Sequence, residues 1–151
     1  MFYTILFSGI ILDYLSKQLA FMYLQDKINL LGDFVYFQYI LNPGIAFGIK
    51  VYPLLLKIAT ISLIILIFYY YRHEKKENNS KLLEISFGLI LSGAIGNAIE
   101  RVFYGNVIDF IGVKYFSIFN LADTFISIGA IIYLYILFKN KNTLCNSDQK
   151  N

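Results

Sequence analysis

The sequence predicts a mainly α-helical integral membrane protein, with four transmembrane helices and a small β-sheet-like subdomain outside the membrane. Its 151 residues are 58% hydrophobic and only 15% charged, whereas a soluble domain is about 25% charged. Four separate stretches are apolar and long enough to cross roughly 30 Å of hydrocarbon as helices. A buried soluble bundle is the alternative, but four such stretches would leave it too little polar surface.

The four predicted spans belong to one domain, which is the default for a chain of this length. They cover about residues 2–24, 52–71, 82–99 and 122–138. The chain is apolar from Phe2 and no small-residue cleavage site follows the first span, which indicates a retained helix rather than a removed signal peptide. We therefore expect a membrane domain over residues 1–139 and a polar tail over residues 140–151.

The positive charges between the spans predict the orientation of the chain. The link 72–81 carries four Lys or Arg residues, and three more Lys follow residue 138. The other two connections, 25–51 and 100–121, together carry four over a much longer stretch. We therefore expect the link and both termini in the cytoplasm. The basic residues do not form a stripe of the kind that binds nucleic acid, so no nucleic-acid partner is expected.

The outer connection 25–51 contains the segment "FVYFQYI", which is rich in β-branched and aromatic residues. It lies between Gly32-Asp33 and Asn42-Pro43-Gly44, two groups of residues typical of turns. This pattern predicts one or two short strands between the first and second transmembrane helices.

Four carboxylates lie in or beside the predicted spans. Asp13 is inside the first span, whereas Glu100, Asp109 and Asp123 come to one level near the outer face if the topology is correct. Ionisable groups at such positions are costly and usually face a bundle interior or a water-filled cavity. The three outer carboxylates are therefore candidates for a functional site.

Asp13 and Lys17 lie four residues apart with the acid first, so they share one face of the first helix. A mutually neutralising pair is the expected role, and direct contact with a substrate is the alternative. In the third span, Gly88, Ser92 and Gly96 recur at four-residue intervals, which favours close packing of helices.

The residue types that are present restrict the possible chemistry. With one His and one Cys, placed in the inner link and the tail, a Ser/His or Cys/His nucleophile and a zinc site of Cys and His are both excluded. Two neighbouring carboxyl groups, however, share a proton, and such a pair can hydrolyse a peptide bond by activating water. Asp123 begins a span, so capping of that helix is the alternative role for its side chain.

Four sequence blocks stand out along the chain, namely "LDYLSK", "NPGIAFG", "GNAIERVFYGNVIDF" and "FNLADTFI". In content and order they closely resemble the motifs of the lipoprotein signal peptidases, which are also called type II or prolipoprotein signal peptidases, and the resemblance covers nearly the whole chain. The resemblance implies a bacterial membrane aspartic endopeptidase that cleaves a prolipoprotein just before a cysteine carrying diacylglycerol. It also implies inhibition by globomycin and no metal or other cofactor.

The resemblance assigns roles to individual residues. It implies that Asp109 and Asp123 are the catalytic aspartates. It further implies substrate binding or support of this pair by Asn42, Gly44, Asn97, Arg101 and Asn120. The family usually has Asp where this chain has Glu100, and the role of this glutamate is left open.

The resemblance also sets the expected location and partners. We expect a multi-pass protein of the bacterial cytoplasmic membrane, monomeric, with its active site near the outer face and with membrane lipids and a lipid-modified prolipoprotein as partners. A small proton-coupled transporter is the alternative from another class, but the acids crowd toward one side of the membrane instead of crossing its depth. An inactive scaffold is a third possibility.

Overall fold

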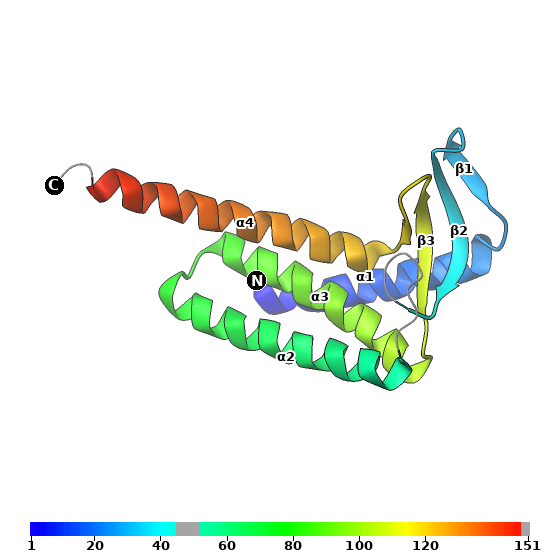
Figure 1. The fold of residues 1–151 in the computed structure, drawn as a ribbon, viewed down its shortest axis with the longest axis horizontal. Helices are drawn as coiled ribbons and strands as arrows, with labels where there is room; N and C mark the ends of the chain where they lie inside the picture. The colour runs from blue at the N-terminus through cyan, green and yellow to red at the C-terminus, as the bar shows by residue number, and fades with distance from the viewer. Residues whose placement is uncertain (45–51, 149–151) are drawn as a thin grey trace.

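The computed structural model describes residues 1–44 and 52–148 of the chain. Four helices lie side by side and a small sheet crosses one end of the bundle (Figure 1). In chain order the elements are α1 (Phe2–Tyr23), β1 (Ile28–Leu31), β2 (Val35–Asn42), α2 (Pro53–Glu77), α3 (Lys81–Phe103), β3 (Val107–Val113), β4 (Ile118–Phe119) and α4 (Leu121–Asp148). The predicted fold class, mainly α with four long apolar helices and a small sheet, is confirmed.

Helix α3 occupies the centre of the bundle and packs against α1, α2 and α4. Small residues allow two of these close approaches. A Cβ atom at Gly93 would collide with the backbone carbonyl of Ala122 in α4, and one at Gly96 would meet the side chain of Asp13 in α1. Glycine at these positions therefore brings the polar residues of α1, α3 and the start of α4 close together.

The end of the bundle away from the sheet is closed by an apolar core and an ion pair. Phe2 stacks on Tyr71, with ring centroids 4.2 Å apart, and both belong to a buried cluster with Leu83 and Phe87. Glu84, in the first turn of α3, accepts a hydrogen bond from Lys75 Nζ at 2.5 Å and another from the backbone N–H of Phe2 at 3.2 Å. This carboxylate links α1, α2 and α3, a role that its position in the sequence did not indicate.

The described strands form one antiparallel sheet in the order β1-β2-β3-β4. The sequence predicted strands only in the connection 25–51, whereas half of this sheet comes from the connection between α3 and α4. In the register of β2 and β3, Leu41 lies opposite Ile108 and Asn42 opposite Val107. The sequence did not predict β3, because Asp109 interrupts the apolar pattern and the partner strand β2 is remote in the sequence. Residues 45–51 lie outside the described residues.

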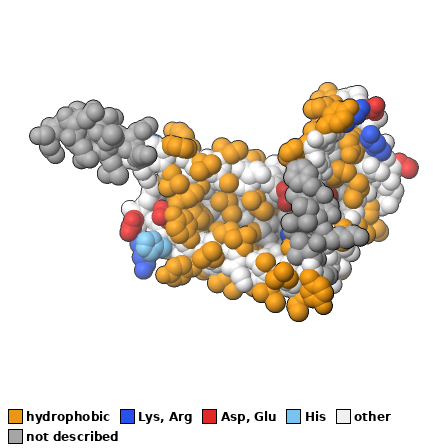
Figure 2. Space-filling model, in the orientation of Figure 1, with side chains coloured by type: hydrophobic (Ala, Val, Ile, Leu, Met, Phe, Trp, Pro, Cys, Tyr) orange, Lys and Arg blue, Asp and Glu red, His pale blue; other side chains and the backbone are white. Residues whose placement is uncertain are grey.

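Helices α2, α3 and α4 run beyond the predicted spans. For α2 the reason is that the Arg, Lys and Glu residues that follow the apolar stretch also favour helix. Helix α4 reaches Asp148, so the predicted tail begins as helix. Figure 2 shows hydrophobic side chains over the helical part of one face, with charged side chains gathered at the α2–α3 end and on the sheet. This is the surface of a bundle surrounded by lipid.

Candidate active site

Asp109 and Asp123 line the same cavity, although they belong to different elements. Asp109 lies in the middle of β3, and Asp123 lies in the first turn of α4. The cavity has a volume of about 510 Å³, and Asn42 and Arg101 also line it. Most of the remaining wall consists of apolar residues from β4, the segment before it, and α4. The fold thus brings two carboxyl groups to one mainly apolar pocket.

Both oxygens of the Asp109 carboxylate accept hydrogen bonds from amides. Asn42 Nδ2 donates to Oδ2 at 2.8 Å, and Asn120 Nδ2 donates to Oδ1 at 2.7 Å. Burial raises the pKa of Asp109 from its usual 3.8 to about 6; the negative charge of Asp123 adds to the increase, and the two amide donors oppose it. This carboxyl group therefore holds its proton at a higher pH than an exposed aspartate.

Asp123 combines helix capping with exposure to the cavity. Its Oδ2 accepts a hydrogen bond from the backbone N–H of Asn120 at 3.2 Å, while Asn120 Oδ1 accepts one from the backbone N–H of Asp123 at 3.0 Å. This reciprocal pair is a capping box at the start of α4. Its other oxygen, Oδ1, accepts a hydrogen bond from Asn97 Nδ2 at 2.8 Å. Asp123 therefore caps α4, which is the alternative role that the sequence predicted. Its Oδ1 atom takes no part in the cap and faces Asn97 of α3.

Asn120 connects the two carboxylates directly. Its side chain is fully buried, and its Nδ2 lies 2.7 Å from Asp109 Oδ1 and 3.2 Å from Asn97 Oδ1. A third contact of 3.2 Å reaches the backbone carbonyl of Ile108, beside Asp109 in β3. Through this one amide, the first turn of α4 is joined to both β3 and α3.

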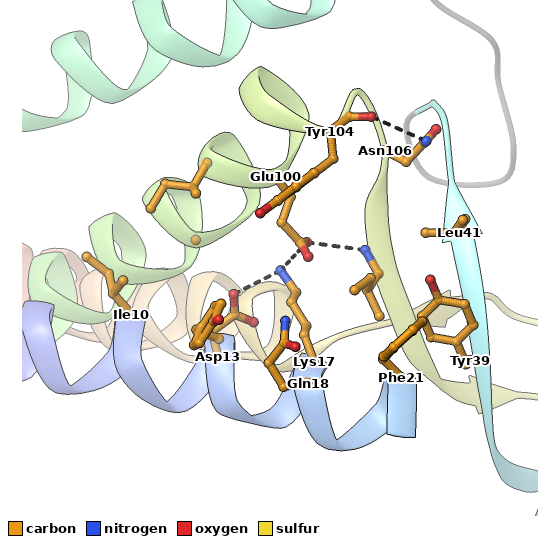
Figure 3. Close-up of a pocket in the computed structure, with 14 residues that line it drawn as sticks. Ile10, Asp13, Lys17, Gln18, Phe21, Tyr39, Leu41, Glu100, Tyr104 and Asn106 are labelled. Carbon is orange, nitrogen blue, oxygen red and sulfur yellow. Dashed lines mark hydrogen bonds and ion pairs between the residues drawn. The ribbon is translucent and has the colours of Figure 1, made fainter. Parts of the chain in front are cut away.

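Lys17 is the centre of a second polar cluster behind this pair. Its ammonium lies 2.8 Å from Asp13 Oδ2, 2.8 Å from Glu100 Oε2 and 2.9 Å from Asn97 Oδ1. Figure 3 shows the ammonium between the two carboxylates. Asp13 Oδ1 also accepts a hydrogen bond from the backbone N–H of Ala122 at 3.0 Å. The pairing of Asp13 with Lys17 was expected, but the sequence offered no sign that Glu100 joins them.

Arg101 lines the cavity, and Gly44 lies next to Arg101 and Asn42. Arg101 Nη2 is 3.5 Å from the carbonyl oxygen of Gly44, whose backbone N–H donates to Asn42 Oδ1 at 3.0 Å. Arg101 Nε is buried, and it has no hydrogen-bond partner within the described part of the chain. The guanidinium therefore retains donors for a further group. The rest of the motif "NPGIAFG" lies outside the described residues.

A second cavity, of about 420 Å³, lies on the other side of α3, between α1 and the sheet (Figure 3). Asp13, Lys17 and Glu100 line it, together with aromatic residues that include Phe21 and Tyr39. Among the described residues, none that lines this cavity also lines the first one. The Lys17 cluster thus faces one cavity and the aspartate pair faces the other.

The chain matches a known family over most of its length. The matching family profile is described as signal peptidase (SPase) II, and it covers residues 5–139. The chain belongs to the signal peptidase II family. It is 38% identical to a lipoprotein signal peptidase of Clostridium tetani, over 89% of this chain and 90% of the relative. It is 35% identical to one of Chlorobium phaeobacteroides, over 99% and 96% of the two chains.

The fold of the chain is also similar to that of solved structures. One described as a bacterial membrane enzyme superposes with a TM-score of 0.83 at 28% identity, over 94% of this chain and 90% of the other. A second gives a TM-score of 0.79 over 91% and 92% of the two chains. Within the described residues, four helices are long and apolar enough to cross a membrane. As a member of this family, the chain is a multi-pass membrane protein and a peptidase, which argues against the alternative of a small transporter.

Proposed function

We propose that the protein is an aspartic endopeptidase that removes signal peptides from bacterial prolipoproteins, cleaving before a diacylglyceryl-modified cysteine. One observation carries the proposal: Asp109 and Asp123 line the same mainly apolar cavity in a signal peptidase II. The relatives named lipoprotein signal peptidase support the substrate class. The site uses no metal and no other cofactor in this mechanism.

The two carboxyl groups divide the acid and base roles. Asp109, with a pKa raised to about 6 by burial, is the member that carries the shared proton. Asp123 stands at the N-terminus of α4, where the helix dipole favours a negative charge. Asp123 therefore takes a proton from water while Asp109 donates its proton to the oxygen of the carbonyl under attack. The tetrahedral intermediate then breaks at its C–N bond, and the proton held by Asp123 passes to the departing amine. As the carbonyl group re-forms, one hydroxyl of the intermediate returns a proton to Asp109, which restores the starting state of the pair.

The neighbouring amides hold this pair in place. Asn97 and Asn120 direct N–H groups at both carboxylates, and Asn42 holds the outer oxygen of Asp109. Arg101 and Gly44 are suited to binding the peptide, since the guanidinium has a buried Nε without a partner among the described residues. Each of these groups limits the motion of a reacting atom, which lowers the entropy lost at the transition state.

The proposed location is the bacterial cytoplasmic membrane, with both termini in the cytoplasm and the aspartate pair near the outer face. The sheet and both aspartates lie at the same end of the bundle, away from the basic link between α2 and α3 (Figure 1). A cavity with apolar walls at this level accommodates a substrate that arrives within the bilayer with its acyl chains in lipid. Both aspartates come from one chain, so a monomer suffices.

Substitution of either aspartate tests the proposal. We expect Asp109→Asn and Asp123→Asn each to lower kcat/KM for a diacylglyceryl-modified precursor peptide by about 10²–10⁴-fold, because each removes one proton-transfer group. The measurement is cleavage of the peptide by purified protein, with binding of globomycin as a check on folding. Asp33→Asn is the matched control, since Asp33 is exposed in the turn between β1 and β2 and its carboxylate accepts a hydrogen bond from Asn29 Nδ2.

Three outcomes distinguish the possibilities. Near-normal turnover in either dyad variant refutes the role given to that residue. Wild-type protein that binds globomycin but cleaves no precursor is the inactive scaffold. An unlipidated precursor that is cleaved as fast as the lipidated one contradicts the proposed substrate class.

A further inference from the structure

We propose that Glu100 is a positioning residue, which ties the two aspartates together from behind and sets the charge that they experience. The inference rests on the proposed function of Asp109 and Asp123. Two routes lead from one oxygen of Glu100 to the pair, one through side chains to Asp123 and one through the backbone to Asp109.

The first route runs through Lys17 and Asn97. Glu100 Oε2 holds the Lys17 ammonium at 2.8 Å, and that ammonium donates to Asn97 Oδ1 at 2.9 Å. An ammonium can only donate hydrogen bonds, so the amide oxygen of Asn97 must face it and the amide nitrogen must face the other way. That nitrogen donates to Asp123 Oδ1 at 2.8 Å. Lys17, held by Glu100, thus fixes the orientation of the amide that contacts the proposed base.

The second route runs through strand β3. The same Oε2 atom of Glu100 accepts a hydrogen bond from the backbone N–H of Ile108 at 3.2 Å. Ile108 precedes Asp109, and its carbonyl oxygen lies 3.2 Å from Asn120 Nδ2. The end of α3 is therefore bonded to the peptide unit beside the proposed acid. Displacement of Glu100 would free this point of β3 and shift Asp109 relative to Asp123.

The negative charge of Glu100 also acts on the aspartate pair without direct contact. The side chains of Lys17 and Asp13 are each 2% exposed and that of Glu100 is 13% exposed, so water screens this cluster poorly. The positive charge of Lys17 lowers the pKa of Asp109, and the two carboxylates that pair with this ammonium, Asp13 and Glu100, offset part of its charge. Among the described residues, the charged groups on the elements packed around Glu100 are Lys17 and Asp13 of α1, Lys57 of α2, Arg101 of α3, Asp109 of β3 and Asp123 of α4.

The position of Glu100 separates it from the substrate. It lines the cavity between α1 and the sheet (Figure 3). Asp109 and Asp123 line the other cavity. Its effect on catalysis therefore passes through Lys17, Asn97 and Ile108. A purely structural role, in which Glu100 only joins α1 to α3, would change stability but would not change how activity depends on pH.

The test is the pH profile of kcat/KM for Glu100→Gln. Removal of one negative charge stabilises ionised carboxylates and so lowers their pKa values. Both the acidic and the basic limb of the pH profile should therefore shift to lower pH, by about 0.5–1 pH unit for one charge at an effective dielectric constant of about 20. Glu100→Asp keeps the charge and should retain the wild-type limbs. Glu84→Gln is the matched control, because Glu84 is also an ion-paired carboxylate of α3 but lies at the other end of the helix.

The outcomes separate this inference from the proposed function. The positioning role is refuted if Glu100→Gln keeps the wild-type limbs of the pH profile, or if Glu84→Gln shifts these limbs equally. In that case the proposed function still stands, provided that Asp109→Asn is inactive. Active dyad variants refute the proposed function itself. If Glu100→Gln does not fold, Asp13→Asn removes the other negative charge from Lys17, and unchanged limbs in that variant refute the electrostatic effect.

Discussion

At the scale of single residues, the burial of Asp109 makes the stability of the protein depend on pH. Its side chain is buried and its pKa is raised from 3.8 to about 6. A carboxyl group with a raised pKa contributes stability that is fully present below pH 3.8 and is lost as the pH rises through 6. One pKa unit corresponds to about 1.4 kcal/mol, so ionised Asp109 costs the folded state about 3 kcal/mol. The residue proposed as the catalytic acid is thus one that weakens the fold when it ionises.

Asp109→Asn should remove this part of the pH dependence. We expect the unfolding temperature of the variant, relative to that of the wild type, to increase between about pH 4 and pH 6.5 and then to level off. Thermal unfolding in detergent at a series of pH values measures this difference. The exposed Asp33→Asn provides the comparison, with a nearly constant difference expected. A constant difference for Asp109→Asn as well would contradict the assigned burial cost.

At the scale of elements, the site depends on the close approach of α3 and the first turn of α4. Gly93 permits this contact, because a Cβ atom there would collide with the carbonyl group of Ala122, directly before Asp123. The backbone cannot move aside as a flexible side chain can. The small residues of α3 therefore do more than pack helices, since they set the depth at which α4 presents its carboxylate to Asn97.

Gly93→Ala should displace the start of α4. We expect a loss of about 1–3 kcal/mol in stability from overpacking, and a fall of about 10- to 100-fold in kcat/KM from misplacement of Asp123. Gly88→Ala is the matched control on the same helix, because its Cβ would mainly meet the side chain of Ile5, 3.0 Å away and far from the site. Thermal unfolding and peptide cleavage measure the two effects, and equal activity in both variants would exclude this role for Gly93.

At the scale of the whole molecule, the arrangement of charges predicts which end faces the cytoplasm. The link between α2 and α3 is basic and lies at the opposite end of the bundle from the sheet (Figure 1). Positive residues are retained on the cytoplasmic side of membrane proteins. The sheet, both aspartates and the cleaved bond are then at the outer face.

The single native cysteine, Cys145, allows this orientation to be measured. In intact cells, a membrane-impermeant thiol reagent should leave Cys145 unlabelled until the membrane is permeabilised. Asp26→Cys, introduced into a Cys145→Ser background, should be labelled without permeabilisation because residue 26 is exposed just before β1. The reverse pattern would place the aspartates on the cytoplasmic side and would contradict the proposed location.

The sequence by itself determined the features that depend on local composition. The lengths of the apolar stretches predict four spans, because each span must satisfy its own backbone hydrogen bonds within lipid. Helical spacing predicts that Asp13 faces Lys17, and the motifs single out Asp109 and Asp123. The ends of the helices were predicted less well, since hydropathy marks where lipid ends and not where helix ends.

Only the tertiary structure decided which distant residues meet. Asn42 bonds to Asp109 across 67 residues, and Lys17 bonds to Asn97 across 80. The pairing of β2 with β3 and the position of Glu100 behind the aspartates depend likewise on how α3 and α4 pack. Apolar patterning is a property of one segment, whereas a hydrogen bond between segments exists only when the whole bundle brings both partners within about 3 Å.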